Sequence, residues 1–457
     1  TIEGGGTNNY SLNLWITDEV DGNYSGQVFS GKLRVEVSQE KSVPNTPEMD
    51  SNMIAVKYEN NNWVKADISN INNEWYNYDE QKWANAVTVS ESTRDNYLSA
   101  DVGTVISMDD IETMWVWIPR YSYTIGSEDG TNYYGKQGDY LDSTPTQALP
   151  GEIDIKFIPI YRNDKGAAKY IVSDGIKSNS WYTPDAFTFG DEELSGIWVG
   201  KFETSSSNPS AGYGGGNTTS LDAMIKPNVT SWGGINVSNA FNVSLKMNDE
   251  GNRYGFSGDV DTHMMKNSEW AVVAYLSQSK YGKLGNEDYT GANKEVYQNK
   301  SRTTGCSYGE PSDNSEDYGC QYTYDVDING TGASTTGTIY GIYDMSGGRS
   351  EFVMSSYNDN VGGSGFVSMP ESRYYDKYTS NNVLTACNGN ECLSHGFSET
   401  RMWYGVYGVF STGTYPGLER GGSYYYTVNS GIFFYYFYND TDNPDYSFRL
   451  VMSRTSS

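Results

Sequence analysis

The chain has 457 residues, a formal net charge of -27 and 40 tyrosines, and aromatic residues make up 14% of it. This length predicts roughly two to four domains, and the negative charge disfavours nucleic acid, because it would repel the phosphate backbone. The aromatic content argues against disorder and, together with the many Tyr, Trp, Thr, Val and Gly residues, favours strands and turns.

Residues 1–40 contain two strand-like runs, Tyr10–Ile16 and Lys32–Ser38. They predict a β-hairpin that ends an upstream sandwich-like module. The chain begins with Thr1 rather than Met, which favours a processed or truncated form. Lys41–Pro47 is predicted to be a linker, because proline and small polar residues interrupt both helices and strands.

Residues 41–125 predict a tryptophan-rich β module built from short hairpins. Trp63, Trp75 and Trp83 recur beside Asn and Asp turn residues. We expect these tryptophans to fill a small core, with stacking on a sugar as the alternative. Thr113–Ile125 is predicted to form one continuous strand, since its apolar residues follow the two-residue period of a strand.

Residues 126–189 predict a loop-rich connection with a strand at Ile153–Ile160. A further strand is expected within Leu194–Ser205. No apolar run reaches the roughly 18 residues that a membrane-spanning helix needs, so we expect no membrane span in this chain.

One helix is predicted over Asn267–Gly282. Asn267 or Ser268 is placed to cap it, Glu269 suits its first turn and Gly282 can end it. An apolar stripe at helical spacing predicts that one face packs against a sheet. Its members are Trp270, Val273, Ala274 and Ser277, flanked by Leu276.

The four cysteines form two pairs that are close in sequence, Cys306 with Cys320 and Cys387 with Cys392. Neither pair has the spacing of a zinc site, and the chain has only two histidines. We interpret the pairs as two short-loop disulfides, which are typical of an oxidising, extracellular setting. Four free thiols are the alternative.

Five motifs follow one another in the last part of the chain: GIWVGKFETS, EWAVVAYL, GIYDMSGGRSEFV, ERGGSY and YSFRLV. This series resembles the formylglycine-generating-enzyme (sulfatase-modifying factor) branch of the C-type-lectin-like fold, over about residues 190–453. Two departures lie in the third motif. Gly348-Arg349-Ser350 stands where Asn-Val-Trp is usual, and Phe352 replaces a tryptophan.

The resemblance implies an α+β fold, with a C-type-lectin-like domain at residues 190–457 preceded by small β-rich modules. Gly421 and Gly422 suit a close backbone approach or a positive φ angle at the start of a strand. Arg449 is predicted to form a structural ion pair with Glu351. A solvent-facing arginine is the alternative.

The resemblance also bears on catalysis. Oxidases of this family use a pair of cysteines in their C-terminal part, whereas this chain has no cysteine from Gly421 to Ser457. We therefore expect no enzyme activity and no catalytic residues.

Asp325–Gly330 is similar to the opening of a calcium-binding loop. The twelfth position of such a loop needs a bidentate glutamate, and here it is Thr336. A β-turn is predicted instead, with no metal or cofactor. A structural calcium ion held by other Asp and Asn oxygens stays open.

A second branch of the lectin-like fold consists of variable proteins diversified by retroelements, which place their variable region at this end of the chain. Mutagenesis of adenines in AAC-type codons cannot produce Trp, Met, Lys, Glu or Gln. Gly421–Val451 lacks all five, while Glu419 and Met452 flank it. The chain therefore resembles a variable protein with its variable region at residues 421–451. A tyrosine-rich strand pair with a chance gap in composition is the alternative.

Alternation in Ile432–Tyr438 predicts that Tyr436 and Tyr438 share one face and Tyr435 takes the other. Tyrosine, Asn, Asp and Ser suit a recognition surface, because the ring buries a large area and the polar groups adapt. The predicted ligand-binding residues are Tyr424, Tyr425, Tyr426, Thr427, Asn429, Tyr435, Tyr436, Tyr438, Asn439, Asp440, Asp442, Asn443 and Tyr446.

The sequence thus predicts a non-catalytic adhesin or receptor-binding protein that carries a diversified site. We expect it on a bacterial cell surface, with a phage tail as the alternative location. Its partner would be a protein or glycan ligand on another cell or surface, and the oligomeric state stays open. The competing functions are a calcium-dependent carbohydrate-binding lectin and, less favoured, an oxidase of the formylglycine-generating type.

Overall fold

The computed structural model describes residues 43–69, 74–125, 151–159, 181–210, 213–311, 318–379, 392–400, 403–406, 408–426, 429–438 and 441–454. The chain divides after Lys41, and all of these residues belong to the unit Ser42–Ser457. The predicted hairpin at residues 1–40 therefore lies outside the described residues. The described elements are mostly strands with few helices.

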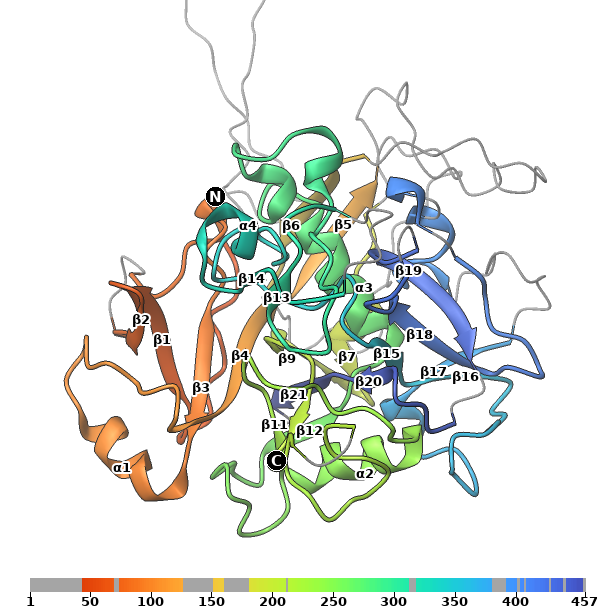
Figure 1. Cartoon of the computed structure of the whole chain (residues 1–457), viewed down its shortest axis with the longest axis horizontal. Coiled ribbons are helices and arrows are strands. Elements are labelled where there is room, and N and C mark those ends of the chain that lie inside the picture. Colours follow the sequence, from red (N-terminus) through yellow and green to blue (C-terminus); the bar gives the residue numbers. More distant parts are fainter. Residues whose placement is uncertain are drawn as a thin grey trace, which may run out of the picture. The chain divides into compact units, whose positions relative to one another are not determined.

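One antiparallel sheet of seven strands crosses the described unit (Figure 1). Its strands in spatial order are β12 (Val260–Met264), β21 (Leu450–Arg454), β9 (Gly196–Gly200), β4 (Ile111–Pro119), β3 (Asn85–Val89), β1 (Ile54–Glu59) and β2 (Asn62–Lys65). β4 pairs directly with β9, from Trp115 opposite Gly200 to Pro119 opposite Gly196. The predicted modules 41–125 and 190–457 therefore contribute to the same sheet, and the predicted boundary does not coincide with a break in it.

A tight turn joins β1 to β2. Asn60 and Asn61 both have positive φ angles, as the two central residues of a primed hairpin turn require. The predicted hairpin at the start of this region is thus confirmed. The helix α1 (Glu91–Ser99) was not predicted, because only Tyr97 and Leu98 contact the core and no apolar stripe marks it.

The tryptophans of this region are core residues. Trp63, Trp75 and Trp83 are at most 4% exposed. Their indole N–H groups make hydrogen bonds within the protein, such as the bond from Trp83 to the Tyr281 carbonyl at 2.8 Å. The alternative role in sugar stacking is excluded for these three rings in this structure, because no ring face is accessible.

The single strand predicted over Thr113–Ile125 is two strands. β4 ends at Pro119, and β5 (Tyr121–Ile125) starts a separate ribbon with β6 (Ile153–Phe157). Proline has no N–H to donate, which favours a strand end. Arg120 lies at the break, where its guanidinium donates to the Phe187 carbonyl at 3.0 Å.

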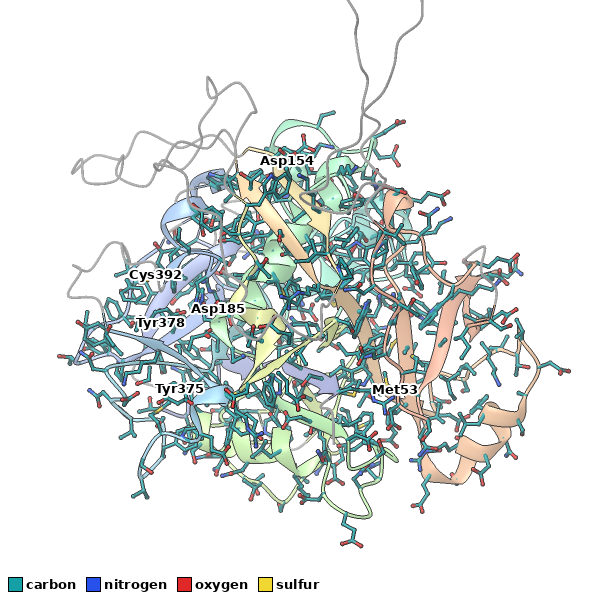
Figure 2. All side chains as sticks on the ribbon, turned by 180° about the vertical axis from the view of Figure 1, so that it is seen from behind. Met53, Asp154, Asp185, Tyr375, Tyr378 and Cys392 are labelled. Atoms are coloured by element: carbon teal, nitrogen blue, oxygen red, sulfur yellow. A yellow bond between two sulfur atoms is a disulfide. The ribbon has the colours of Figure 1, made fainter. Side chains whose placement is uncertain are left out.

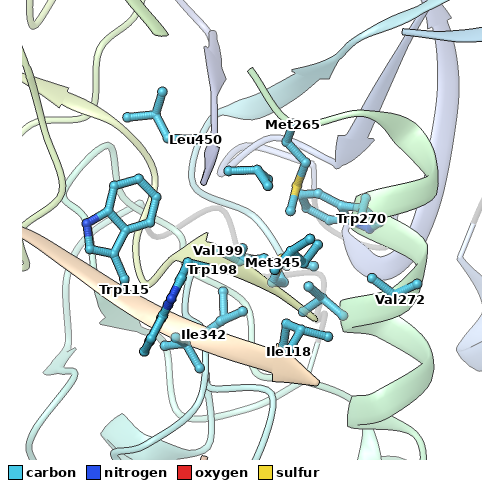
Figure 3. Packing of buried hydrophobic residues seen from close by; sticks show 14 of the residues in the cluster. Trp115, Ile118, Trp198, Val199, Met265, Trp270, Val272, Ile342, Met345 and Leu450 are labelled. Atoms are coloured by element: carbon cyan, nitrogen blue, oxygen red, sulfur yellow. The ribbon is translucent and has the colours of Figure 1, made fainter. Parts of the chain in front are cut away.

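The helix α3 (Asn267–Ser277) lies inside the molecule, and every one of its residues is buried. The predicted one-sided stripe was therefore wrong, since α3 has protein on all sides. Figure 3 shows Trp270 and Met265 turned toward Met345 and Val199, in the layer between α3 and the seven-stranded sheet. The Trp270 indole also donates to the Ile432 carbonyl at 2.8 Å and so links α3 to the C-terminal strands.

Two carboxylates cap the first turn of α3. Glu269 accepts a hydrogen bond from the Lys266 N–H at 2.7 Å, and Asp376 accepts one from the Ser268 N–H at 2.6 Å. Both satisfy donors that have no partner within the helix. The capping residue is thus Lys266 rather than the predicted Asn267 or Ser268.

A second sheet of four strands carries the C-terminal window. Its order is β19 (Gly431–Tyr438), β18 (Gly417–Gly421), β15 (Ser350–Val353) and β20 (Tyr446–Phe448). β19, β18 and β15 are antiparallel, and β20 is parallel to β15. The window 421–451 therefore supplies the two outer strands of this sheet, and Figure 1 shows them in blue.

Two further α-helices and four further two-stranded ribbons complete the described α-helices and strands. They are the helices α2 (Val237–Lys246) and α4 (Asp327–Thr331) and the ribbons β7–β8 (Thr188–Phe189, Glu192–Glu193), β10–β11 (Ser205–Ser206, Ala223–Met224), β13–β14 (Cys306–Ser307, Tyr322–Thr323) and β16–β17 (Ser355–Tyr357, Asp376–Tyr378). None of the helices in the described ranges is long and apolar enough to cross a membrane.

The predicted ion pair between Arg449 and Glu351 is confirmed. Both side chains are fully buried, Arg449 Nε donates to Glu351 Oε2 at 3.0 Å, and a second guanidinium nitrogen contacts Glu351 Oε1. The remaining donors of Arg449 reach the carbonyls of Gly200 and Tyr343 at 2.9 and 3.0 Å. Arg449 therefore connects the two sheets.

We predict that Arg449→Met lowers the free energy of unfolding by about 3–5 kcal/mol, because it leaves the Glu351 carboxylate buried without its guanidinium. Urea denaturation followed by circular dichroism measures the loss. The double variant Arg449→Met with Glu351→Leu should be more stable than the single one, since it removes the buried charge as well. A single variant as stable as wild type would contradict a structural role for the pair.

Candidate ligand-binding face

β18 and β19 place alternate side chains on opposite faces of the four-stranded sheet. Glu419 lies opposite Tyr436, and Arg420 lies opposite Tyr435. This register confirms the predicted alternation from Tyr435 to Tyr438. We call the face with Arg420 and Tyr435 the inner face, and the face with Glu419 and Tyr436 the outer face.

The inner face packs against α3 and the segments near His395. Arg420 is fully buried and donates to Asn267 Oδ1 at 2.7 Å and to the His395 carbonyl at 2.6 Å. His395 Nδ1 lies 2.7 Å from the Tyr378 hydroxyl, and its Nε2 lies 3.7 Å from Asp185 (Figure 2 labels Tyr378 and Asp185). This face is therefore part of the protein interior.

Tyr435 belongs to this interior, although the sequence placed it among the ligand-binding residues. It is 0% exposed, its ring lies 5.0 Å from that of Phe397, and the Arg420 guanidinium lies 5.2 Å from its centroid. Gly408 approaches the ring so closely that a Cβ there would lie 2.5 Å from it. A ligand has no access to Tyr435 in this structure.

The outer face carries two groups of aromatic rings. One group runs along the loop and β19, where Tyr426 neighbours Phe434 at 6.3 Å and Phe434 is stacked at 6.5 Å with Tyr436. The other joins Tyr438 and Tyr446, which are stacked with centroids 4.2 Å apart. Tyr426, Tyr436 and Tyr438 are half-buried, so their rings are the accessible part of this face.

Tyr446 is less accessible than predicted. It is 6% exposed, because it is stacked between Tyr438 and Phe352, whose centroid is 5.0 Å away. Its ring supports Tyr438 from below rather than offering a surface of its own. The correction follows from the parallel pairing of β20 with β15, which brings Tyr446 beside the fully buried Phe352.

The predicted polar positions lie at the rim. Asn429 and Asp442 are exposed, whereas Asn443 is half-buried and shapes a turn. The Asn443 side chain accepts the Asp445 N–H at 2.9 Å, and its carbonyl accepts the N–H of Gly234 at 2.9 Å. Asn443 therefore has a structural role in addition to its predicted one. Three further predicted positions, Thr427, Asn439 and Asp440, lie outside the described residues.

The loop before β19 presents three half-buried tyrosines in a row, Tyr424, Tyr425 and Tyr426. Arg302 holds the first of them, since its guanidinium lies 4.9 Å from the Tyr424 ring centroid and contacts the hydroxyl. Gln298 holds the last, because its amide donates to the Tyr426 carbonyl at 2.6 Å.

The frame around this loop is rigid for local reasons. Gly421 and Gly422 have φ angles of +78° and +72°, which confirms the predicted need for glycine. A Cβ at Gly422 would lie 2.7 Å from the Asn429 carbonyl oxygen, so the two ends of the loop approach each other closely.

Glu295 holds the first residues of β19 from below. It is 2% exposed, and its Oε1 accepts the Ile432 N–H at 3.1 Å. Burial raises the pKa of Glu295 to about 8, because the ionised carboxylate loses solvation that this hydrogen bond and the charge of Lys283 only partly replace.

The disulfide between Cys306 and Cys320 is present, as predicted. It closes a short loop next to the ribbon β13–β14. The second predicted pair involves Cys387, which lies outside the described residues.

The sequence motif at Asp325–Gly330 ends in the helix α4 rather than in a β-turn alone. Among the described residues, no group of three or more His, Cys, Asp or Glu side chains is arranged to hold a metal ion. A hollow of about 560 Å³ with an acidic lining lies elsewhere, between Phe189 and Arg373, with Asp191, Glu192 and Glu371 in its wall.

Sequence reasoning missed several residues that build the face. They are Arg302 and Gln298, which contact the loop before β19, and Glu295, which contacts β19 itself. All three lie more than 100 positions before the segments that they contact, so no local pattern could reveal them. Glu419 lies in the quoted motif ERGGSY, and the two-residue period of a strand could have placed it beneath the tyrosines.

No protein-family model matches the chain, and no curated protein matches it. Among solved structures the chain is similar to a protein titled "Major Tropism Determinant M1 Variant", with 13% identity and a TM-score of 0.26. The alignment covers 91% of this chain and 87% of that one. This similarity is too low to establish a shared fold.

We predict that Glu295→Gln changes the pH dependence of stability. The folded pKa of about 8 exceeds the ordinary 4.5, so the native state binds the extra proton and stability falls as the pH rises through this window. Glutamine does not titrate, so the variant does not lose stability for this reason as the pH rises. Relative to wild type, it should gain a few kcal/mol between pH 5 and 9, since one pKa unit is about 1.4 kcal/mol.

Urea midpoints of both proteins across this pH range provide the measurement. The difference between the two proteins matters rather than either curve, because other buried carboxylates, such as Glu203 and Glu351, also have raised pKa values. A difference that does not change with pH would show that Glu295 is ionised throughout.

Proposed function

We propose that this chain is a non-catalytic, surface-displayed protein that binds a protein or glycan ligand through the outer face of its four-stranded sheet. One observation carries the proposal. The window 421–451 supplies two strands and a loop whose half-buried tyrosines lie on a frame of fully buried residues. Solvent-accessible aromatic rings on a rigid support are typical of recognition surfaces.

The chemistry of the rings supports binding. Each tyrosine buries a large area with few rotatable bonds, and its hydroxyl can donate and accept a hydrogen bond. Tyr436 and Tyr438 are the half-buried tyrosines of β19, and the row of Tyr424, Tyr425 and Tyr426 adjoins β19 through Phe434. The exposed Asn429 and Asp442 supply a polar rim, as in protein interfaces generally.

We further propose that the domain is C-type-lectin-like, of the formylglycine-generating-enzyme type, and that a retroelement diversifies its window. The composition of Gly421–Val451 and the motifs quoted above support this assignment. The disulfide between Cys306 and Cys320 supports an extracellular location, on a bacterial surface or a phage tail.

Two tyrosines should dominate the affinity. We predict that the double variant Tyr436→Ala, Tyr438→Ala binds its target at least about tenfold more weakly, because central aromatic residues carry most of the binding energy. The labelled chain is titrated on intact cells of a panel of bacterial strains, and saturable binding is read by flow cytometry. Each titration is repeated with EDTA, since loss of binding on chelation would instead favour the calcium-dependent lectin.

Tyr97→Ala is the matched control, because Tyr97 lies on α1, well away from β19 in Figure 1. It should bind like wild type. Both proteins should remain folded and unfold cooperatively on heating. Equal binding of the double variant and wild type, or no saturable binding to any strain, would contradict the proposed face.

Diversification predicts a particular gene neighbourhood. A reverse transcriptase gene and a near-identical repeat of the segment encoding residues 421–451 should lie close to this gene. The two repeats should differ at adenine positions of the template. Sequencing of the locus measures this directly, and the absence of both features would exclude diversification while leaving the binding proposal in place.

A further inference from the structure

Glu419 lies at the centre of the outer face, beneath its rings. Its strand neighbours are Tyr436 on β19 and Phe352 on β15, so it separates the two aromatic groups. It is 1% exposed. Among the described residues whose strand positions fall on the outer face, Glu419 is the one with a charged side chain.

The charge of Glu419 reaches the tyrosine hydroxyls. Burial is the main cause of the raised pKa values of Tyr426 and Tyr446, and the Glu419 charge is the next. Glu419 also contributes to the raised pKa of Tyr425. A negative charge below phenol rings increases the attraction of those rings for a cation.

The charges around the face favour a positive ligand. Three carboxylates belong to this region, those of Glu419, Asp442 and Asp445. The bases near Asp445 are Arg302, which lies 2.8 Å from it, and the buried Arg349. The chain as a whole carries a formal net charge of -27. A cationic group would therefore be attracted to this face, and an anionic one repelled.

The chain itself already contains a guanidinium placed over a tyrosine ring. The Arg302 guanidinium lies 4.9 Å from the Tyr424 ring centroid and pairs with a carboxylate, that of Asp445. Tyr424 is the first ring of the row that continues through Tyr425 and Tyr426. A guanidinium suits such a site better than an ammonium does, because its flat surface stacks on an aromatic ring.

We propose that the outer face recognises an arginine side chain of a partner protein, whose guanidinium stacks on Tyr436 and Tyr438 above the Glu419 carboxylate. This inference rests on the proposed function and names the ligand class of the same site. A partner protein is favoured over a small free cation, because the rings line a sheet surface on which the rest of an interface can be buried.

The test compares two probes that have nearly the same shape and differ in charge, N-acetyl-arginine methylamide and N-acetyl-citrulline methylamide. NMR titration of the full chain with selectively labelled tyrosine rings gives both affinities. Wild type should bind the arginine probe at least about fivefold more tightly, since a cation–π contact at a partly exposed site has this size. Equal affinities would overturn the proposal, as would tighter binding of choline, which would indicate a quaternary ammonium ligand.

Glu419→Gln removes the charge with little change of shape and should reduce the preference for arginine to less than about twofold. Glu91→Gln is the control, because it removes the same charge from the distant helix α1 and should leave the preference unchanged. Tyr436→Leu is the second variant if Glu419→Gln does not fold. It should lower the affinity for the arginine probe more than the affinity for the citrulline probe. A preference for the arginine probe that is unchanged in both Glu419→Gln and Tyr436→Leu would overturn the proposal.

These outcomes are separate from those of the cell-binding experiment. Suppose that the Tyr436→Ala, Tyr438→Ala variant loses cell binding while wild type binds the two probes with equal affinity. This result would contradict only the proposed ligand class. A preference of wild type for the arginine probe, without saturable binding to any cell, would contradict only the proposed function.

Discussion

The arrangement of this molecule depends on one buried arginine. Arg449 stands between β20 and β21, at the point where the chain leaves the four-stranded sheet and enters the seven-stranded one. It pairs with Glu351 in the first sheet and donates to the Gly200 carbonyl in the second. A buried guanidinium without partners would cost several kcal/mol of stability. The two sheets therefore keep the relative position in which Arg449 reaches both Glu351 and the Gly200 carbonyl.

This fixed relation decides which half of the tyrosine-rich strand is accessible. The inner face of β18 and β19 packs against α3. There Arg420 donates hydrogen bonds to the Asn267 side chain and the His395 carbonyl instead of to water. The same packing turns Tyr436 and Tyr438 outward. Alternation thus separates the adjacent rings of Tyr435 and Tyr436 into one that serves stability and one that serves recognition, whereas Phe434 is buried although it lies on the outer face. Tyr435 contributes to the core, and Tyr436 to the surface.

Much of this arrangement follows from local sequence, and the rest does not. The alternation of β19 and the positive φ angles of Gly421 and Gly422 were predicted, since each reflects a short-range rule. The pair of Arg449 with Glu351 was also predicted, although it joins residues of two separate motifs 98 positions apart. Which face of β19 is buried could not be predicted, because both faces are equally aromatic and only distant segments such as Gly408 cover one of them. For the same reason the sequence could not show that residues 41–125 extend the sheet of residues 190–457.

Glu419 differs from the rings above it in a way that matters under the proposed diversification. Glutamate is outside the set of residues that mutagenesis of AAC-type codons can produce, and Glu419 lies just before the window 421–451. Arg302, which holds Tyr424, lies far outside the window too. The negative charge would therefore stay constant while the rings change. Sibling proteins would then differ in the shapes they accept but share a preference for cationic side chains, so that a common electrostatic attraction accompanies a variable fit.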